Sequence, residues 1–218
     1  MNPKSFLPTV ALLFSLPLSG QTLCDSVLTI HAGTRSIAPF EYAERQDFHT
    51  VVFAEPCSVA EIGEGAFRWC ESLHTVVLPE TLKDIGRGAF AYCEGLNSVN
   101  FPSSLRHIGP AAFTFCKSLE SVVLPDGITE LESYAFAECT SLHSATLPAN
   151  NHLLGELIFS GCQALESITC LSPTPPPFDC NSTLFEANES FMYRRCHLTV
   201  LPTALPLYRE APSWSLFF

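Results

Sequence analysis

Cysteine recurs in this chain with a regularity that a metal or redox centre could use. Five of the ten cysteines stand 23 residues apart, and each follows a phenylalanine by three positions. The pairs are Phe67/Cys70, Phe90/Cys93, Phe113/Cys116, Phe136/Cys139 and Phe159/Cys162. A structural zinc site needs paired cysteines such as C-x-x-C, and this series contains no such pair. The even spacing of single cysteines instead indicates a repeated inward position, where a thiol packs as a small apolar side chain.

We call these five residues the cysteine ladder and predict that their thiols are buried and unbridged. In stacked repeats their Cβ vectors would run parallel, which is poor geometry for a disulfide. Cys170 takes a leucine position of the last repeat and is also expected to pack inward. Cys180 and Cys196 flank a 15-residue segment that breaks the repeat. A disulfide between them would add about 3 kcal/mol of stability, and the sequence leaves both redox states open for this pair.

Histidines form a second set of candidate ligands. His49 and His74 occupy the same repeat position in neighbouring repeats, but the next repeat has Asn97 there and supplies no third ligand. We therefore expect solvated polar side chains and no metal site in this row, which continues with Glu120, His143 and Glu166. A weaker hypothesis is that these histidines make partner binding depend on pH between about 5 and 7.

Catalytic motifs are missing from the sequence. There is no phosphate-binding glycine loop, no G-x-S-x-G, no H-E-x-x-H and no calcium loop. The non-repeated C-terminal region holds Asp179, Glu186, Glu189 and His197, but their spacing is not typical of an active site. We expect no catalytic residues and no cofactor, so that an enzyme is the least favoured class.

The elements that carry the ladder follow from one repeat, Ile62 to Pro79, which reads I-G-E-G-A-F-R-W-C-E-S-L-H-T-V-V-L-P. Alternation in its L-x-x-V-x-L part predicts a short strand with one buried face. The proline after it cannot donate to a sheet ladder and ends the strand. The compact A-F-x-x-C part suits a helical turn. Stacked repeats of this kind predict an α/β repeat solenoid of 23-residue coils, each with a short parallel strand plus a short helix or turn.

The chain divides into four regions. Residues 1–20 read as a secretory signal peptide, with Lys4 before an apolar stretch that is too short to span a bilayer comfortably. Residues 21–36 supply an N-terminal cap strand, residues 37–172 about six solenoid coils, and residues 173–218 a proline-rich connector and a C-terminal capping segment. The last region is rich in aromatic residues, which we expect to cover the core that a final coil exposes. The alternative is that these rings form a protein-binding patch on the surface.

The net negative charge of the chain disfavours partners that are themselves anionic. Removal of Lys4 with the signal leaves 10 basic and 22 acidic side chains, a net charge of about −12. So acidic a surface repels phosphate backbones and anionic lipid headgroups. We therefore expect no nucleic-acid partner, and no transmembrane segment remains after signal removal.

The repeat closely resembles that of the BspA-like leucine-rich repeat family of bacterial surface proteins. The matching motif is C-x-x-L-x-x-V-x-L-P-x-x-[LI]-x-x-I-G-x-x-A-F-x-x-C, and the resemblance covers nearly all of Val27 to Phe218. It implies a leucine-rich-repeat arc that is secreted or exposed at the cell surface. It also implies a role in adhesion or binding, with a protein of the extracellular matrix, the host or another bacterial surface as partner.

Alternate strand positions should form two rows on the concave face, and these are the candidate binding residues. The hydroxyl row consists of Thr50, Thr75, Ser98, Ser121, Ser144 and Ser167. The mixed row consists of Val52, Val77, Asn100, Val123, Thr146 and Thr169. An even surface of small, uncharged residues suits a protein or extended peptide better than a small molecule, which prefers a pocket. The simpler explanation is a set of good β-formers at exposed sites. A structural component of the cell envelope without a dedicated ligand is the alternative function.

Overall fold

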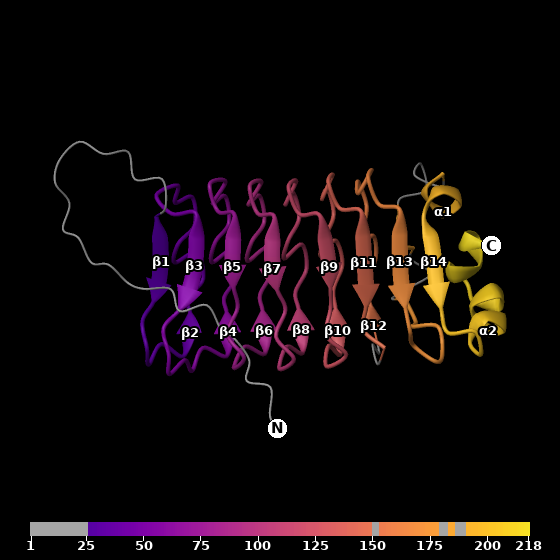
Figure 1. Cartoon of the computed structure of the whole chain (residues 1–218), viewed down its shortest axis with the longest axis horizontal. Coiled ribbons are helices and arrows are strands. Elements are labelled where there is room, and N and C mark those ends of the chain that lie inside the picture. The colour runs from indigo at the N-terminus through magenta and orange to yellow at the C-terminus, as the bar shows by residue number, and fades with distance from the viewer. Residues whose placement is uncertain (1–25, 150–152, 179–182, 186–190) are drawn as a thin grey trace, which may run out of the picture.

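The computed structural model describes residues 26–149, 153–178, 183–185 and 191–218 (Figure 1). The predicted signal peptide and Cys180 lie outside the described residues. The chain winds into a solenoid whose coils stack along one axis, from β1 near the N-terminus to β14 near the C-terminus. Among the described residues, we find no helix of the length and apolar character needed to cross a membrane.

The longer strands of the coils form one wall of the solenoid, which we call the strand face. In chain order they are β1 (Val27–Ile30), β3 (Thr50–Phe53), β5 (Thr75–Val77), β7 (Ser98–Asn100), β9 (Ser121–Val123), β11 (Ser144–Leu147), β13 (Ser167–Cys170) and β14 (His197–Val200). Hydrogen-bonded neighbours are parallel and in register, so that Thr50 lies beside Thr75 and Ser144 beside Ser167. Thus β1 and β14 extend the six predicted coil strands by one strand at each end.

A second parallel sheet, which the sequence analysis did not anticipate, lines another side of the coils. It consists of two-residue strands, β2 (Ser36–Ile37), β4 (Glu61–Ile62), β6 (Asp84–Ile85), β8 (His107–Ile108), β10 (Glu130–Leu131) and β12 (Leu153–Leu154). Arrows of the two sheets point in opposite directions in Figure 1, because the chain reverses within each coil. The second residue of each strand from β2 to β10 is buried, while the first faces outward.

Of the two forms predicted for the A-F-x-x-C segment of each coil, a short helix or a turn, the structure has the turn. Within each turn alternate backbone N–H groups bond to the next coil: Phe67 N–H donates to the Ala89 carbonyl at 2.7 Å and Trp69 N–H to the Ala91 carbonyl at 2.9 Å. Trp69 also has a φ of 64°, which ends any right-handed helix. Helices in the described residues occur only near the C-terminus, as α1 (Met192–Arg195), α2 (Leu205–Glu210) and the 3₁₀ helix η2 (Trp214–Phe217).

Large side chains are tolerated at these left-handed positions because they stack on one another. Trp69, Tyr92 and Phe115 hold the same turn position in successive coils, all with positive φ. Their ring centroids are 3.8 Å apart for Trp69 and Tyr92, and 4.7 Å apart for Tyr92 and Phe115. Aromatic pairs of this kind contribute about 0.5–1.5 kcal/mol each beyond burial, which offsets the backbone cost.

Phenylalanine forms the centre of the core. The rings of Phe67, Phe90, Phe113 and Phe136 stack in a column, with centroid separations of 5.1, 5.1 and 5.3 Å. These residues and the cysteine ladder are buried together with the inward strand residues in one apolar cluster. Each coil therefore buries its apolar side only by contact with its neighbours, as a solenoid requires.

The aromatic C-terminal segment belongs to the same apolar cluster as the coils. Trp214 and Tyr208 are buried, and the Trp214 indole N–H donates to the Pro176 carbonyl at 2.9 Å. The hydroxyl of Tyr208 lies 3.1 Å from Cys170 Sγ on β13. The proline-rich connector and the helices that follow are thus tied to the last coil by specific hydrogen bonds.

Candidate functional site

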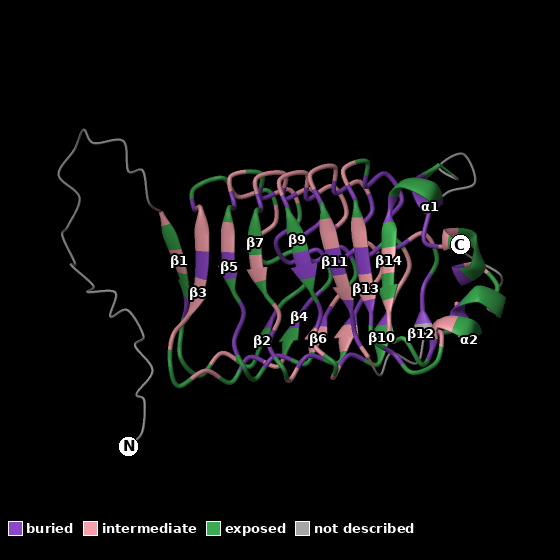
Figure 2. Cartoon of the chain, turned by 45° about the vertical axis from the view of Figure 1, so that its right-hand side comes forward, coloured by how far each residue is buried: buried purple, intermediate pink, exposed green. Residues whose placement is uncertain are grey.

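The two predicted rows do face outward. In every strand from β3 to β13 the candidate residues are half-buried or exposed, and they alternate with inward residues such as Val51, Val122 and Ile168 (Figure 2). The hydroxyl row continues into His197 and the mixed row into Thr199 on β14. The pairing registers place the members of each row side by side within each part of the sheet.

A break divides the strand face between β7 and β9. No strand ladder joins these two fully described elements, whereas β1-β3-β5-β7 and β9-β11-β13-β14 are each continuous. Figure 1 shows the wider separation of β7 from β9. The candidates that border the break, Ser98, Asn100, Ser121 and Val123, are all exposed, and Val123 reaches 66% exposure. Among the candidate residues from β3 to β13, these four and Val77 are therefore the most accessible.

Two side chains at the end of β7 account for this break. Asn100 turns toward β5: its Oδ1 accepts from the Leu78 N–H at 2.7 Å, and its Nδ2 donates to the Leu78 carbonyl at 3.1 Å. These two bonds hold β7 against β5. Phe101 stands where the neighbouring coils have leucine, and its ring lies edge-on to Phe113 at 5.5 Å. The extra volume of this ring favours separation of β7 from β9.

The histidine row is arranged as expected at its start. His49 and His74 are neighbours, with ring centroids 5.3 Å apart. The Nδ1 atom of His49 is buried and has no hydrogen-bond partner among the described residues. His74 is exposed, and the following row member, Asn97, is exposed as well. The proposed pH dependence of this row stays a prediction.

The cysteine ladder is structural, as predicted. Its thiols are buried, and none of the five forms a disulfide. Each ladder thiol donates to a backbone carbonyl of the preceding coil; for Cys93 the acceptor is Phe67 at 3.1 Å and for Cys116 it is Phe90 at 3.3 Å. Burial raises the pKa of Cys70 to about 11 and those of Cys93 and Cys116 well above the usual range. The thiols are therefore protonated donors and not nucleophiles.

The predicted pairing of Cys180 with Cys196 stays a prediction, since Cys180 lies outside the described residues. Cys196 is buried just before β14. Burial raises the pKa of its thiol to about 12.

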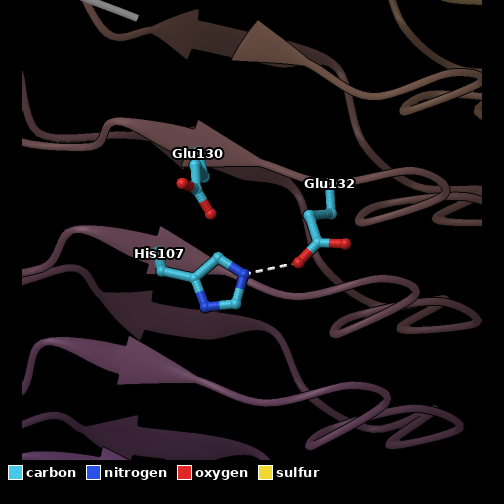
Figure 3. Close-up of side chains that lie close together, drawn as sticks. All are labelled: His107, Glu130 and Glu132. Carbon is cyan, nitrogen blue, oxygen red and sulfur yellow. Dashed lines mark hydrogen bonds and ion pairs between the residues drawn. The ribbon is translucent and has the colours of Figure 1, made fainter. Parts of the chain in front are cut away.

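A different polar cluster was missed by the sequence analysis. His107 of β8 lies with Glu130 and Glu132 of the next coil, and one potential ligand atom from each falls within 4.8 Å of the others (Figure 3). The signal that could have revealed it is a single departure from the repeat. Glu132 occupies a position that is glycine in the other four repeats of the cysteine ladder, at Gly63, Gly86, Gly109 and Gly155, and alanine in the first coil, at Ala38.

Comparison with known proteins identifies the repeat. The pattern described as the BspA type Leucine rich repeat region matches residues 35–174 in six copies. The match covers well over half of the chain, and the chain therefore belongs to the BspA-type leucine-rich repeat family. No functionally curated protein matches it.

Three solved structures share this solenoid. A leucine-rich repeat protein from Bacteroides ovatus is 31% identical with a TM-score of 0.60, over 69% of this chain and 41% of that one. A leucine rich cell surface protein from Faecalibacterium prausnitzii is 29% identical with a TM-score of 0.62, over 71% and 41%. The T. pallidum leucine-rich repeat protein is 26% identical with a TM-score of 0.68, over 83% and 87%. The chain thus spans less than half the length of the first two proteins.

Proposed function

We propose that this protein is a secreted or cell-surface module that binds a protein partner through the strand face. The observation that carries the proposal is the outward display of small, uncharged side chains over the six parallel strands from β3 to β13. Such a surface offers contact area without the desolvation cost of buried charges. Membership of the BspA type and the likeness to a cell surface protein of F. prausnitzii support the location.

The contact should centre on the break between β7 and β9. Ser98 and Ser121 expose hydroxyls on its two sides, and the exposed Val77 and Val123 add apolar area, at 49% and 66% exposure. A partner that covers these two valines would remove their apolar area from water, and the neighbouring hydroxyls would offer hydrogen bonds to it. An extended peptide segment or a flat protein surface fits this arrangement better than a small molecule does.

The test is a charge insertion with a matched control. The variant Thr75→Lys, Ser98→Lys, Ser121→Lys adds three positive charges to the strand face. The control Glu64→Gln, Glu156→Gln, Glu210→Gln raises the net charge by the same amount at exposed positions away from that face. Both variants and the unaltered chain would be used to capture proteins from host-cell surfaces, extracellular matrix and bacterial envelopes.

We expect a specific partner to be retained by the unaltered chain and the control and lost by the lysine variant. Equal recovery with the lysine variant would place the contact elsewhere. Failure of all three chains to retain any partner would favour a structural role in the cell envelope.

A further inference from the structure

We propose that His107, Glu130 and Glu132 form a binding site for a divalent transition-metal ion such as Zn²⁺ on the outer side of the small-strand sheet. The site lies on β8, β10 and the residue after β10, away from the strand face, and it does not depend on the proposed function. It revises the expectation from the sequence that the chain holds no metal ligands.

Nitrogen and oxygen donor atoms converge at this site. The Nε2 atom of His107 is 2.6 Å from Oε1 of Glu132, and Glu130 approaches the same imidazole from the neighbouring strand (Figure 3). Two atoms that each coordinate zinc at about 2.1 Å lie at most about 4.2 Å apart. The observed spread of up to 4.8 Å therefore requires only rotation of side chains. Glu130 is exposed and has room for that rotation.

The register of the small-strand sheet creates this convergence. His107 pairs directly with Glu130 on one side and with Asp84 on the other. The outward row is otherwise acidic, since it runs Glu61, Asp84, His107 and Glu130 along four adjacent strands. Strands about 4.8 Å apart bring facing side chains of such a row within reach of one ion.

Glu132 departs from the repeat pattern, which has glycine at this position in the neighbouring coils. In the other repeats of the cysteine ladder the equivalent positions are glycine, and a Cβ added at Gly109 would come within 2.9 Å of the Arg87 backbone nitrogen. A Cβ at Gly86 would meet the Glu64 nitrogen at the same distance. Among the five repeats of the cysteine ladder, only the coil that follows His107 has a side chain there, and that side chain reaches the imidazole. The departure from glycine is therefore coupled to the presence of a potential metal ligand in the previous coil.

Charge and chemistry define the ligand. Three carboxylates surround His107, because Asp84 Oδ1 also lies 3.7 Å from its Nδ1. A dication would offset their mutual repulsion. One imidazole with two carboxylates is a ligand set that zinc and neighbouring first-row metals accept, whereas calcium and magnesium prefer oxygen alone. Side-chain exposures of 27% for His107 and 41% for Glu132 leave a coordination position open to water.

The experiment is a titration of the purified chain with ZnCl₂ in an isothermal calorimeter, after accessible thiols have been alkylated. Glu132→Gly restores the residue of the other repeats and should fold, and His107→Gln removes the imidazole. Glu61→Gln is the matched control, since Glu61 is an exposed member of the same row without a histidine neighbour. Circular dichroism would verify that every variant is folded.

We expect one zinc ion per chain in the unaltered protein and in Glu61→Gln. Each of the other two variants should bind at least about tenfold more weakly, since even indirect changes at metal sites cost about 10–100-fold. Titration with CoCl₂ should give d–d absorption without a thiolate charge-transfer band. Equal zinc affinity in Glu132→Gly, no zinc binding by the unaltered chain, or a thiolate band with cobalt would each overturn the proposal.

Discussion

The thiol of Cys116 donates a hydrogen bond to the backbone carbonyl of Phe90 in the preceding coil, over 3.3 Å. Cys139 repeats this relationship with Phe113 at 3.2 Å. The same carbonyl oxygen of Phe90 also accepts from the Cys93 N–H within its own turn. Each ladder thiol thus links two coils while it fills a small apolar site, which explains why cysteine can occupy this position without disulfide or metal chemistry.

This arrangement predicts a loss of stability at alkaline pH. Below pH 9 the Cys70 thiol is protonated in both the folded and the unfolded chain. Between pH 9 and about 11 only the unfolded chain loses the proton, because burial raises the pKa in the fold. The free energy of unfolding should then fall by about 1.4 kcal/mol per pH unit for each such thiol. Urea denaturation at a series of pH values measures this slope.

The slope has a direct control in Cys70→Ala, which removes one of these thiols. Its stability curve should be flatter than that of the unaltered chain by about one thiol's contribution, or 1.4 kcal/mol per pH unit. Parallel curves for the two proteins between pH 9 and 11 would contradict the proposed protonation of Cys70 in the fold.

Truncation in the middle of the phenylalanine column should be costly. Phe113 is fully buried and stacks on Phe90 and Phe136. Phe113→Ala should lower the free energy of unfolding by about 3–5 kcal/mol, because it leaves a cavity that rigid neighbouring coils cannot fill. Thermal or urea denaturation measures the loss.

Phe191→Ala is the matched control, since this side chain is 53% exposed. Its effect should stay within about 0.5 kcal/mol. Similar losses for Phe191 and Phe113 would show that the column is not the main source of stability.

Removal of the Asn100 side chain should loosen β7. Asn100→Ala leaves the Leu78 N–H and carbonyl without their two side-chain partners and should cost about 1–3 kcal/mol. The exposed Asn97, three residues earlier, is the control, and Asn97→Ala should change stability little. Hydrogen exchange of the Leu78 amide would report the lost bond directly; unchanged protection in Asn100→Ala would argue against the side-chain clamp.

We predict that the C-terminal segment acts as a cap. Deletion of residues 173–218 removes β14 and the buried Trp214 and Tyr208, and would expose β13 and the end of the core. The truncated chain should aggregate, which light scattering would detect. A soluble, folded truncation that has lost only partner binding would instead support the alternative of a protein-binding patch.

Much of the solenoid could be read from sequence because its period is strict. The L-x-x-V-x-L segments predicted the parallel strands from β3 to β13, and the alternation in them predicted which residues face outward. The A-F-x-x-C segments were predicted as a short helix or a turn, because a spacing of three suits both. The bonds from Phe67 and Trp69 to the next coil decide between the two, and a single repeat cannot reveal them.

By itself the sequence determined the class of fold, which strand residues face inward or outward, and the burial of the cysteine ladder. All three depend on periodicity and on local chemistry. Only the tertiary structure decided where the strand face opens and which polar residues meet. The break between β7 and β9 depends on Asn100 and Phe101 contacting different neighbouring coils. The approach of Glu132 to His107 joins residues 25 positions apart through the register of two short strands. Contacts between coils set both features, and such contacts follow from stacking and not from any one repeat.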